Sequence, residues 1–396
     1  MIRRLASTLA IAALVSSGAA ACSSSSDDAS SPSTSTASST TEVVDARPAY
    51  EGRGPHPVGS EAIALADGRR VVVWYPAADD AADQPKETFD IASLLSPDLQ
   101  AQIEPELRPQ YEIDAHPGAD PATDGPFPVV LFSHGYAGFP EQSADLTSHL
   151  ASWGFVVVAP DHVERSLSGL LGTAAAGVKP MEDPAVLSAS LDAAIADADR
   201  DGSPLVDLLD LDHVAVVGHS AGARAAYLTA SSDDRVDAFI SYSVGLTAGP
   251  EDTATEPPPV PKVPGMVMLG EADGIIPADT SRSVYEGMAT PKYLVEIADA
   301  GHLVFSDICL IGRDQGGLVA LVKEAGLELP DTLLRLASDG CEDDALLPSK
   351  AFPAIDHFSV AFLRAELGID EQPVGLDADT AKAFTTADIT FESDPG

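Results

Sequence analysis

Residues Val214-Ala215-Val216-Val217-Gly218-His219-Ser220-Ala221-Gly222 form an apolar run that ends in a serine between two glycines. Such a run is typical of a strand buried on both faces, and the alanine-rich residues that follow indicate a helix. A strand, a sharp turn and a helix are the context that a G-x-S-x-G nucleophile elbow requires. Glycines are needed beside the serine because a Cβ at Gly218 or Gly222 would clash within so tight a turn. Ser220 is therefore the candidate nucleophile.

Apolar runs and helical patterns alternate along the rest of the chain. Further strands are predicted at Val71–Tyr75, Pro128–Phe132, Phe155–Ala159, Ala238–Ser241, Met266–Leu269 and Tyr293–Ile297. Helices are predicted at Gln142–Trp153, Ala185–Ala198, Ala221–Ala230, Asp279–Met288 and Ala354–Leu367. Continuous apolar strands between helices predict an α/β fold with a mostly parallel, doubly wound sheet flanked by helices.

A second turn follows the strand predicted at 128–132 and reads Ser133-His134-Gly135-Tyr136-Ala137-Gly138. Ester hydrolysis passes through an oxyanion, which needs two backbone N–H groups aimed at the developing charge. We expect the N–H groups of Tyr136 and Ala221 to supply them, with Gly135 allowing the chain to turn. An ordinary turn after a strand is the alternative interpretation.

A serine nucleophile needs a base, and the base needs an orienting acid. Asp273 and His302 each follow a predicted strand, and the chain order Ser, Asp, His matches that of hydrolases with this elbow. Glu271 is the competing acid, but it lies closer to the end of its strand. His219 is part of the elbow and too constrained to reach its neighbour's hydroxyl, and His134 belongs to the turn expected to supply an oxyanion donor. The others considered, His149, His162, His213 and His357, fall on helices or at the ends of elements.

Taken together, these motifs over Gly59–Leu367 resemble the α/β-hydrolase superfamily. Within it they are most similar to exported ester hydrolases: the dienelactone-hydrolase-like group, bacterial proteins like platelet-activating-factor acetylhydrolase, and cutinases or polyester hydrolases. The resemblance implies a serine esterase that works through an acyl-enzyme. It also implies Ser220 as nucleophile, His302 as base, Asp273 as acid, and Tyr136 and Ala221 as oxyanion donors.

Three departures leave the substrate open among short-chain, lipid and polyester-type esters. Dienelactone hydrolases proper use a cysteine where this chain has Ser220. Animal acetylhydrolases place their acid after the preceding strand, where Ser241-Tyr242-Ser243 offers no carboxylate, and polyester hydrolases place there a tryptophan that is absent. A peptidase or amidase on the same fold, or a cell-surface binding protein without activity, are the alternatives.

Charge restricts the partners of the chain. It has 22 Lys and Arg against 62 Asp and Glu, a formal net charge of −40, which excludes nucleic acid and makes anionic substrates poor candidates. With 45% hydrophobic residues the chain can still bury a large core. No phosphate-binding, haem or flavin motif occurs, so we expect no cofactor, and we expect a monomer acting on a small-molecule or lipid ester.

The N-terminal residues predict export. Residues 1–21 combine Arg3 and Arg4 with an apolar core and small residues, as a signal peptide does, and Cys22 then resembles the lipidated cysteine of a bacterial lipoprotein. An ordinary secretory signal is the alternative, so the protein is expected to be lipid-anchored at the membrane or secreted. Residues 22–48 read as a disordered tether, 49–370 as the catalytic domain and 371–396 as an acidic, poorly packed tail.

Two insertions, at about 77–126 and 304–350, interrupt the catalytic domain, and the later one resembles a lid. Its Cys309 and Cys341 are expected to form a disulfide in an oxidising compartment, with free thiols as the alternative. No metal site is predicted, because neither cysteine has a second ligand at zinc spacing. Asp197–Asp201 begins like a calcium loop but has Leu208 at the closing position, so a solvated helix end is favoured.

Overall fold

A ten-stranded sheet forms the centre of the protein in the computed structural model, which describes residues 49–247, 257–324, 326 and 330–396. The strand order is β12-β11-β10-β9-β8-β6-β7-β2-β1-β5. The signal peptide expected at 1–21, the lipidation at Cys22 and the tether to residue 48 lie outside the described residues and stay predictions. Within those residues, no helix is both long enough and apolar enough to span a bilayer.

Six neighbouring strands of the sheet are parallel, as predicted. They are β6 (Phe127–Ser133), β7 (Val156–Pro160), β8 (Leu209–His219), β9 (Ala238–Tyr242), β10 (Gly265–Gly270) and β11 (Lys292–Ile297). Beyond β7 the sheet continues with β2 (Arg70–Pro76), which is antiparallel to both β7 and β1 (Val58–Ala64), and ends at the short β5 (His116–Pro117).

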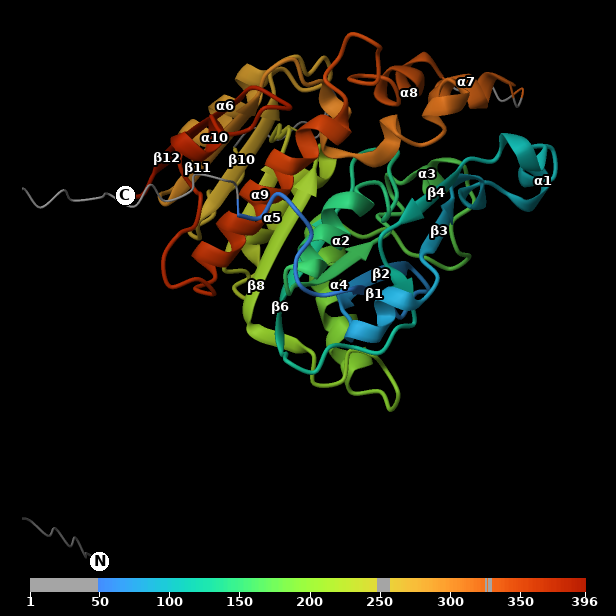
Figure 1. The fold of residues 1–396 in the computed structure, drawn as a ribbon. Helices are drawn as coiled ribbons and strands as arrows, with labels where there is room; N and C mark the ends of the chain where they lie inside the picture. The colour runs from blue at the N-terminus through green and yellow to red at the C-terminus, as the bar shows by residue number, and fades with distance from the viewer. Residues whose placement is uncertain (1–48, 248–256, 325, 327–329) are drawn as a thin grey trace, which may run out of the picture. The chain divides into compact units, whose positions relative to one another are not determined.

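Helices cover both faces of this sheet (Figure 1). On one face α2 (Ala144–Ser152) and α9 (Pro348–Glu366) pack against Val72 and Trp74 and their neighbours. On the other face α4 (Asp183–Ala198), α5 (Ala221–Ser232) and α6 (Ala278–Gly287) enclose a second core with Val71 and Val73. Consecutive residues of β2 thus enter opposite cores, which explains the continuous apolar runs and confirms the doubly wound α/β fold.

The insertion at 77–126 contains more regular structure than the expected loop or helical excursion. It forms a two-stranded antiparallel sheet of β3 and β4 with short helices between them. Besides β5, its elements are η1 (Asp79–Asp83), β3 (Glu87–Asp90), η2 (Ile91–Leu94), α1 (Pro97–Gln100), η3 (Pro105–Leu107) and β4 (Gln110–Ile113).

The insertion at 304–350 is helical and begins within η4 (His302–Phe305). It contains η5 (Asp307–Cys309), η6 (Arg313–Gln315), α7 (Gly317–Glu324) and α8 (Asp331–Leu336). A disulfide joins Cys309 to Cys341, with their Cα atoms 5.0 Å apart.

The prediction of a poorly packed tail over 371–396 is wrong. These residues form α10 (Ala378–Ala381) and β12 (Ile389–Asp394), and β12 pairs antiparallel with β11. Phe384 and Ile389 are buried, and the ring of Phe391 stacks on that of Phe358 at 5.3 Å. Apolar residues at every second position give this acidic segment one face that can join the core.

Candidate active site

The turn after β8 holds Ser220 in a strained conformation, with φ 60° and ψ −118°. Only close packing around the turn can maintain such a geometry in a residue with a side chain. A Cβ added to Gly222 would lie 1.9 Å from the carbonyl oxygen of Ser133, and one added to Gly218 would lie 2.2 Å from that of Gly222. The steric reason expected for both glycines is therefore confirmed.

Two loops after neighbouring strands bring His302 and Asp273 to this serine. His302 Nε2 lies 2.9 Å from Ser220 Oγ, and His302 Nδ1 lies 2.8 Å from Asp273 Oδ2. Asp273 Oδ1 accepts hydrogen bonds from the backbone N–H groups of Ile275 (2.8 Å) and Ile276 (2.7 Å). The side chains of both His302 and Asp273 are almost fully buried, at 2% and 1% exposed.

The environment of Asp273 favours its ionised form. Burial raises the pKa of this carboxyl, but the hydrogen bond and charge of His302 and the N–H of Ile276 outweigh it and hold the pKa below its usual range. The competing acid, Glu271, is exposed and lies 3.8 Å from Arg282 instead. Asp273 is thus a carboxylate that can orient the imidazole of His302.

The peptide between Gly135 and Tyr136 is held by its carbonyl. Gly135 O accepts hydrogen bonds from Arg165 Nη1 (3.0 Å) and from His134 Nδ1 (2.8 Å). Since C=O and N–H point in opposite directions in a trans peptide, these bonds aim the Tyr136 N–H away from Arg165. The Arg165 guanidinium is itself fixed by Asp183, whose two carboxylate oxygens lie 3.0 and 3.2 Å from Nε.

The N–H groups of Tyr136 and Ala221 are free of protein acceptors among the residues that the structure describes. Ala221 begins α5, where the first N–H groups have no partner within the helix. The role expected of Gly135 is corrected, because the residue with positive φ is Ala137, at 57°. A Cβ on Gly135 would lie at an ordinary 3.4 Å from Ser220 Cβ, so glycine is not needed there for the turn.

Gln142 connects the two turns to the loop of His302. Its Oε1 accepts from the N–H of Gly135 (3.0 Å), and its Nε2 donates to His219 Nδ1 (3.0 Å). His219 Nε2 then donates to the carbonyl oxygen of His302 (2.9 Å). Burial and the neighbouring His302 lower the pKa of His219 to about 3, so this histidine is neutral, as its acceptor role at Nδ1 requires.

A pocket of about 340 Å³ opens over Ser220. Both insertions contribute apolar walls, and the remaining wall comes from the turn after β6 and from α3 (Leu167–Leu170). The residues of the two insertions that line it are Ile91, Ala92, Leu95, Leu99, Ile103, Leu107, Pro109, Ile308, Leu318, Val319, Leu321, Val322, Leu333, Leu334, Leu336 and Ala337. Ser220 and His302 therefore lie at the floor of an apolar pocket, and Asp273 is hydrogen-bonded to His302.

Comparisons with known proteins point to ester hydrolases. The family model for chlorophyllase matches residues 118–261, and that for platelet-activating factor acetylhydrolase, isoform II, matches residues 44–176. A Methylorubrum extorquens protein named "Putative carboxymethylenebutenolidase" is 25% identical over 58% of this chain and 79% of its own length. Chlorophyllase-2 of Arabidopsis thaliana is 24% identical over 60% of this chain and 85% of its own length.

The chain is an α/β-hydrolase esterase. Among solved structures, a ferulic acid esterase from Streptomyces cinnamoneus is similar to this esterase with a TM-score of 0.49 and 19% identity, over 78% of this chain and 90% of the other.

Three residues of the esterase's site were missed in the sequence. Gln142 stands at the start of a predicted helix and gave no separate signal. Arg165 could have been suspected, because it is a cation in a polar cluster just after a buried strand. Asp339 lies in the lid-like insertion, and its carboxylate accepts from the backbone N–H of His302, 37 residues earlier in the chain. At 197–201, where the sequence favours a solvated helix end over a calcium loop, α4 ends at Ala198 and Asp197 binds Arg200 (2.9 Å) and Ser203.

His219→Gln is expected to make the esterase less sensitive to acid. A histidine whose pKa falls on folding contributes stability that is present above the unfolded pKa near 6.5 and lost as the pH falls toward the folded value, here about 3. At pH 4.5 this loss amounts to about 2–3 kcal/mol. Urea unfolding at pH 7.5 and 4.5 should show a smaller drop in the variant, and equal drops would contradict the neutral His219.

Proposed function

We propose that this esterase is a serine hydrolase that cleaves neutral carboxylic esters bearing an apolar chain. The observation that carries the proposal is the 2.9 Å contact between Ser220 Oγ and His302 Nε2 at the floor of the apolar pocket. A nucleophile, a base in hydrogen-bond reach and an acid that orients the base are the parts that acyl transfer needs.

In the proposed reaction His302 removes the proton of Ser220 Oγ as the oxygen attacks the ester carbonyl. Asp273 holds Nδ1 of the imidazole protonated and stabilises the imidazolium that forms. The N–H groups of Tyr136 and Ala221 stabilise the oxyanion, and each such donor is worth about 2.7–4 kcal/mol in comparable sites. His302 then protonates the departing alkoxide. A water activated by the same histidine releases the acid from the acyl-enzyme.

The apolar walls of the pocket favour a substrate with an aliphatic or similarly apolar group. No Asp, Glu, Lys or Arg side chain is among its lining residues in the described parts of the chain. A volume of about 340 Å³ corresponds to roughly eleven water molecules at about 30 Å³ each, and a methylene group is of similar size. The net charge of −40 disfavours anionic esters in addition.

p-Nitrophenyl esters with saturated acyl chains of two to sixteen carbons test this proposal. The expected result is a kcat/KM that rises with chain length to a maximum near eight to twelve carbons, since each buried methylene adds about 0.8 kcal/mol until the pocket is full. Leu318→Trp, which narrows the pocket, should move the maximum to shorter chains, whereas Leu211→Trp, at an exposed leucine outside the pocket, should not. A maximum at two carbons, or equal shifts in both variants, would contradict the proposal.

A further inference from the structure

Asp339 is a carboxylate outside the proposed triad that contacts both loops carrying its acid and its base. Its Oδ1 accepts a hydrogen bond from the backbone N–H of His302 (2.7 Å) and another from that of Gly274 (3.2 Å), the residue after Asp273. A single oxygen of the lid-like insertion thus joins the two loops whose spacing sets the distance between His302 and Asp273.

The backbone around Asp339 is packed tightly against the same two loops. The carbonyl oxygen of Asp339 accepts from the N–H of Leu303 (3.0 Å). A Cβ added to Gly301 would lie 2.4 Å from the Cα of Gly340, and one added to Gly274 would lie 2.3 Å from Asp339 Oδ2. Contacts this close leave Asp339 little room to shift without moving His302.

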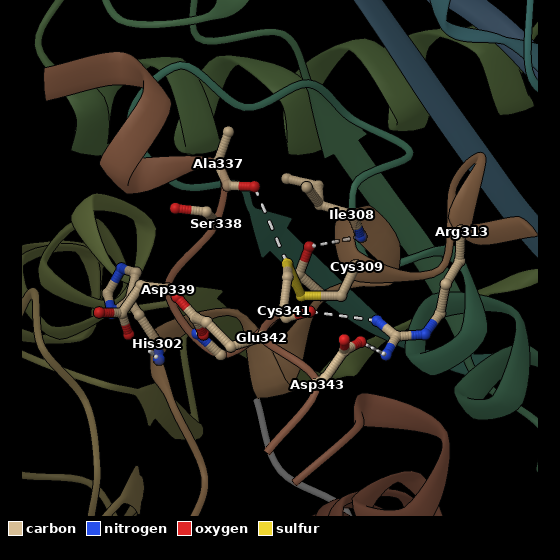
Figure 2. Close-up of a disulfide and its surroundings, with 12 residues drawn as sticks. His302, Ile308, Cys309, Arg313, Ala337, Ser338, Asp339, Cys341, Glu342 and Asp343 are labelled. Atoms are coloured by element: carbon tan, nitrogen blue, oxygen red, sulfur yellow. Dashed lines mark hydrogen bonds and ion pairs between the residues drawn. A yellow bond between two sulfur atoms is a disulfide. The ribbon is translucent and has the colours of Figure 1, made fainter. Parts of the chain in front are cut away.

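The disulfide fixes this segment from the other side (Figure 2). Cys341 follows Asp339 by two residues, and its partner Cys309 belongs to η5, just after the short helix that begins at His302. Arg313 Nη1 also donates to the carbonyl oxygen of Cys341 (3.2 Å). Figure 2 shows Asp339 between the disulfide and His302, so the covalent link and the hydrogen bonds act on one short stretch of chain.

We propose that Asp339 is a positioning residue of the catalytic triad, held in place by the Cys309–Cys341 disulfide. The inference rests on the proposed function, because it assigns to Asp339 the alignment of His302 with Ser220 and Asp273. Asp339 acts through the backbone of His302 and Gly274 and touches no reacting atom. Since a misplacement of about 1 Å can cost 100-fold in rate, loss of this link is expected to lower the rate of chemistry. The insertion therefore completes the triad as well as walling the pocket.

Asp339→Ala, Asp339→Asn and the matched control Asp343→Ala test the inference. Asp343 lies on the same loop, is fully exposed, and its carboxylate pairs with Arg313 at 3.7 Å. Asp339→Ala is expected to lower kcat about 10- to 100-fold and to slow labelling of Ser220 by a fluorophosphonate by the same factor, with KM within twofold. Asp339→Asn keeps a carbonyl oxygen at Oδ1 and should restore most of kcat. Asp343→Ala should behave as wild type.

A wild-type kcat in Asp339→Ala, an unrestored kcat in Asp339→Asn, or an equal loss in Asp343→Ala would overturn the inference. Should Asp339→Ala fail to fold, the double variant Cys309→Ser/Cys341→Ser provides the second measurement. It is expected to lower kcat at least fivefold with KM within twofold, and an unchanged kcat would overturn the role of the disulfide. Ser220→Ala, assayed in parallel, separates the two proposals. If Ser220→Ala stays active, the proposed function itself fails. If Ser220→Ala is inactive while Asp339→Ala is fully active, only the present inference is refuted.

Discussion

Replacing Ser220 with alanine is expected to lower kcat by a factor of about 10⁶, the loss seen when the nucleophile of a comparable triad is removed. In the proposed mechanism the acyl-enzyme cannot form without Oγ, so the remaining rate would come from the oxyanion donors and the binding of the substrate alone. Pre-steady-state assays with an excess of a p-nitrophenyl ester should therefore lose the initial burst. KM is expected to change little, since the walls of the pocket are untouched.

Ser232→Ala is the control for this prediction. Ser232 stands at the far end of α5, exposed, with its hydroxyl bonded to the carbonyl oxygen of Leu228 (2.7 Å). The control should retain full activity and should still be labelled at Ser220 by a fluorophosphonate, as judged by mass spectrometry of the peptides. A Ser220→Ala enzyme with more than about one per cent of the wild-type kcat would exclude Ser220 as the nucleophile.

Arg165→Met is expected to lower the free energy of unfolding by about 3–5 kcal/mol, the usual cost of removing one partner from a buried ion pair. The side chain is buried and donates to Ser133 Oγ (2.9 Å) as well as to Asp183 and the carbonyl oxygen of Gly135. All these groups would lose a donor inside the protein. The urea midpoint should fall accordingly, and kcat should fall too, because the Gly135–Tyr136 peptide would lose one of the bonds that orient it.

Arg235→Met is the matched control. Arg235 pairs with Asp192 and Asp233 at 2.6 Å each, but its side chain is 38% exposed, so its loss should cost no more than about 1 kcal/mol. Arg165→Lys should fall between wild type and Arg165→Met, since an ammonium keeps the charge but not the planar fork of donors. Equal losses of unfolding free energy in Arg165→Met and Arg235→Met would show that burial does not make the Arg165–Asp183 pair more important for stability.

The central sheet and the loops at its edge could be predicted because they follow local patterns. The strand of residues 214–217 is apolar on both faces, and its serine, like Asp273 and His302, comes just after a strand. In parallel strands these ends meet at one edge of the sheet, so chain order alone brings the three side chains close together. Their distances and hydrogen bonds required the structure.

The missed features depend on contacts between distant segments. Asp339 reaches the N–H of His302 from 37 residues further along the chain, and no local pattern marks an acid that accepts from two backbone groups. The turn at Ala137 was assigned to Gly135 because glycine is the usual residue for a tight turn, but here tertiary contacts hold an alanine at positive φ. In β12 the many acidic residues obscured the alternation of Ile389 and Phe391.

The position of β12 at the margin of the sheet has a consequence for self-association. An uncovered edge strand can pair with the same strand of another molecule and start aggregation, and charged side chains are a common protection. β12 ends the sheet with Glu392 and Asp394 exposed, on a chain whose net charge is −40. Two β12 edges with these negative charges repel each other. The acidic residues that made β12 hard to recognise in the sequence therefore also disfavour pairing of β12 with the β12 of a second molecule.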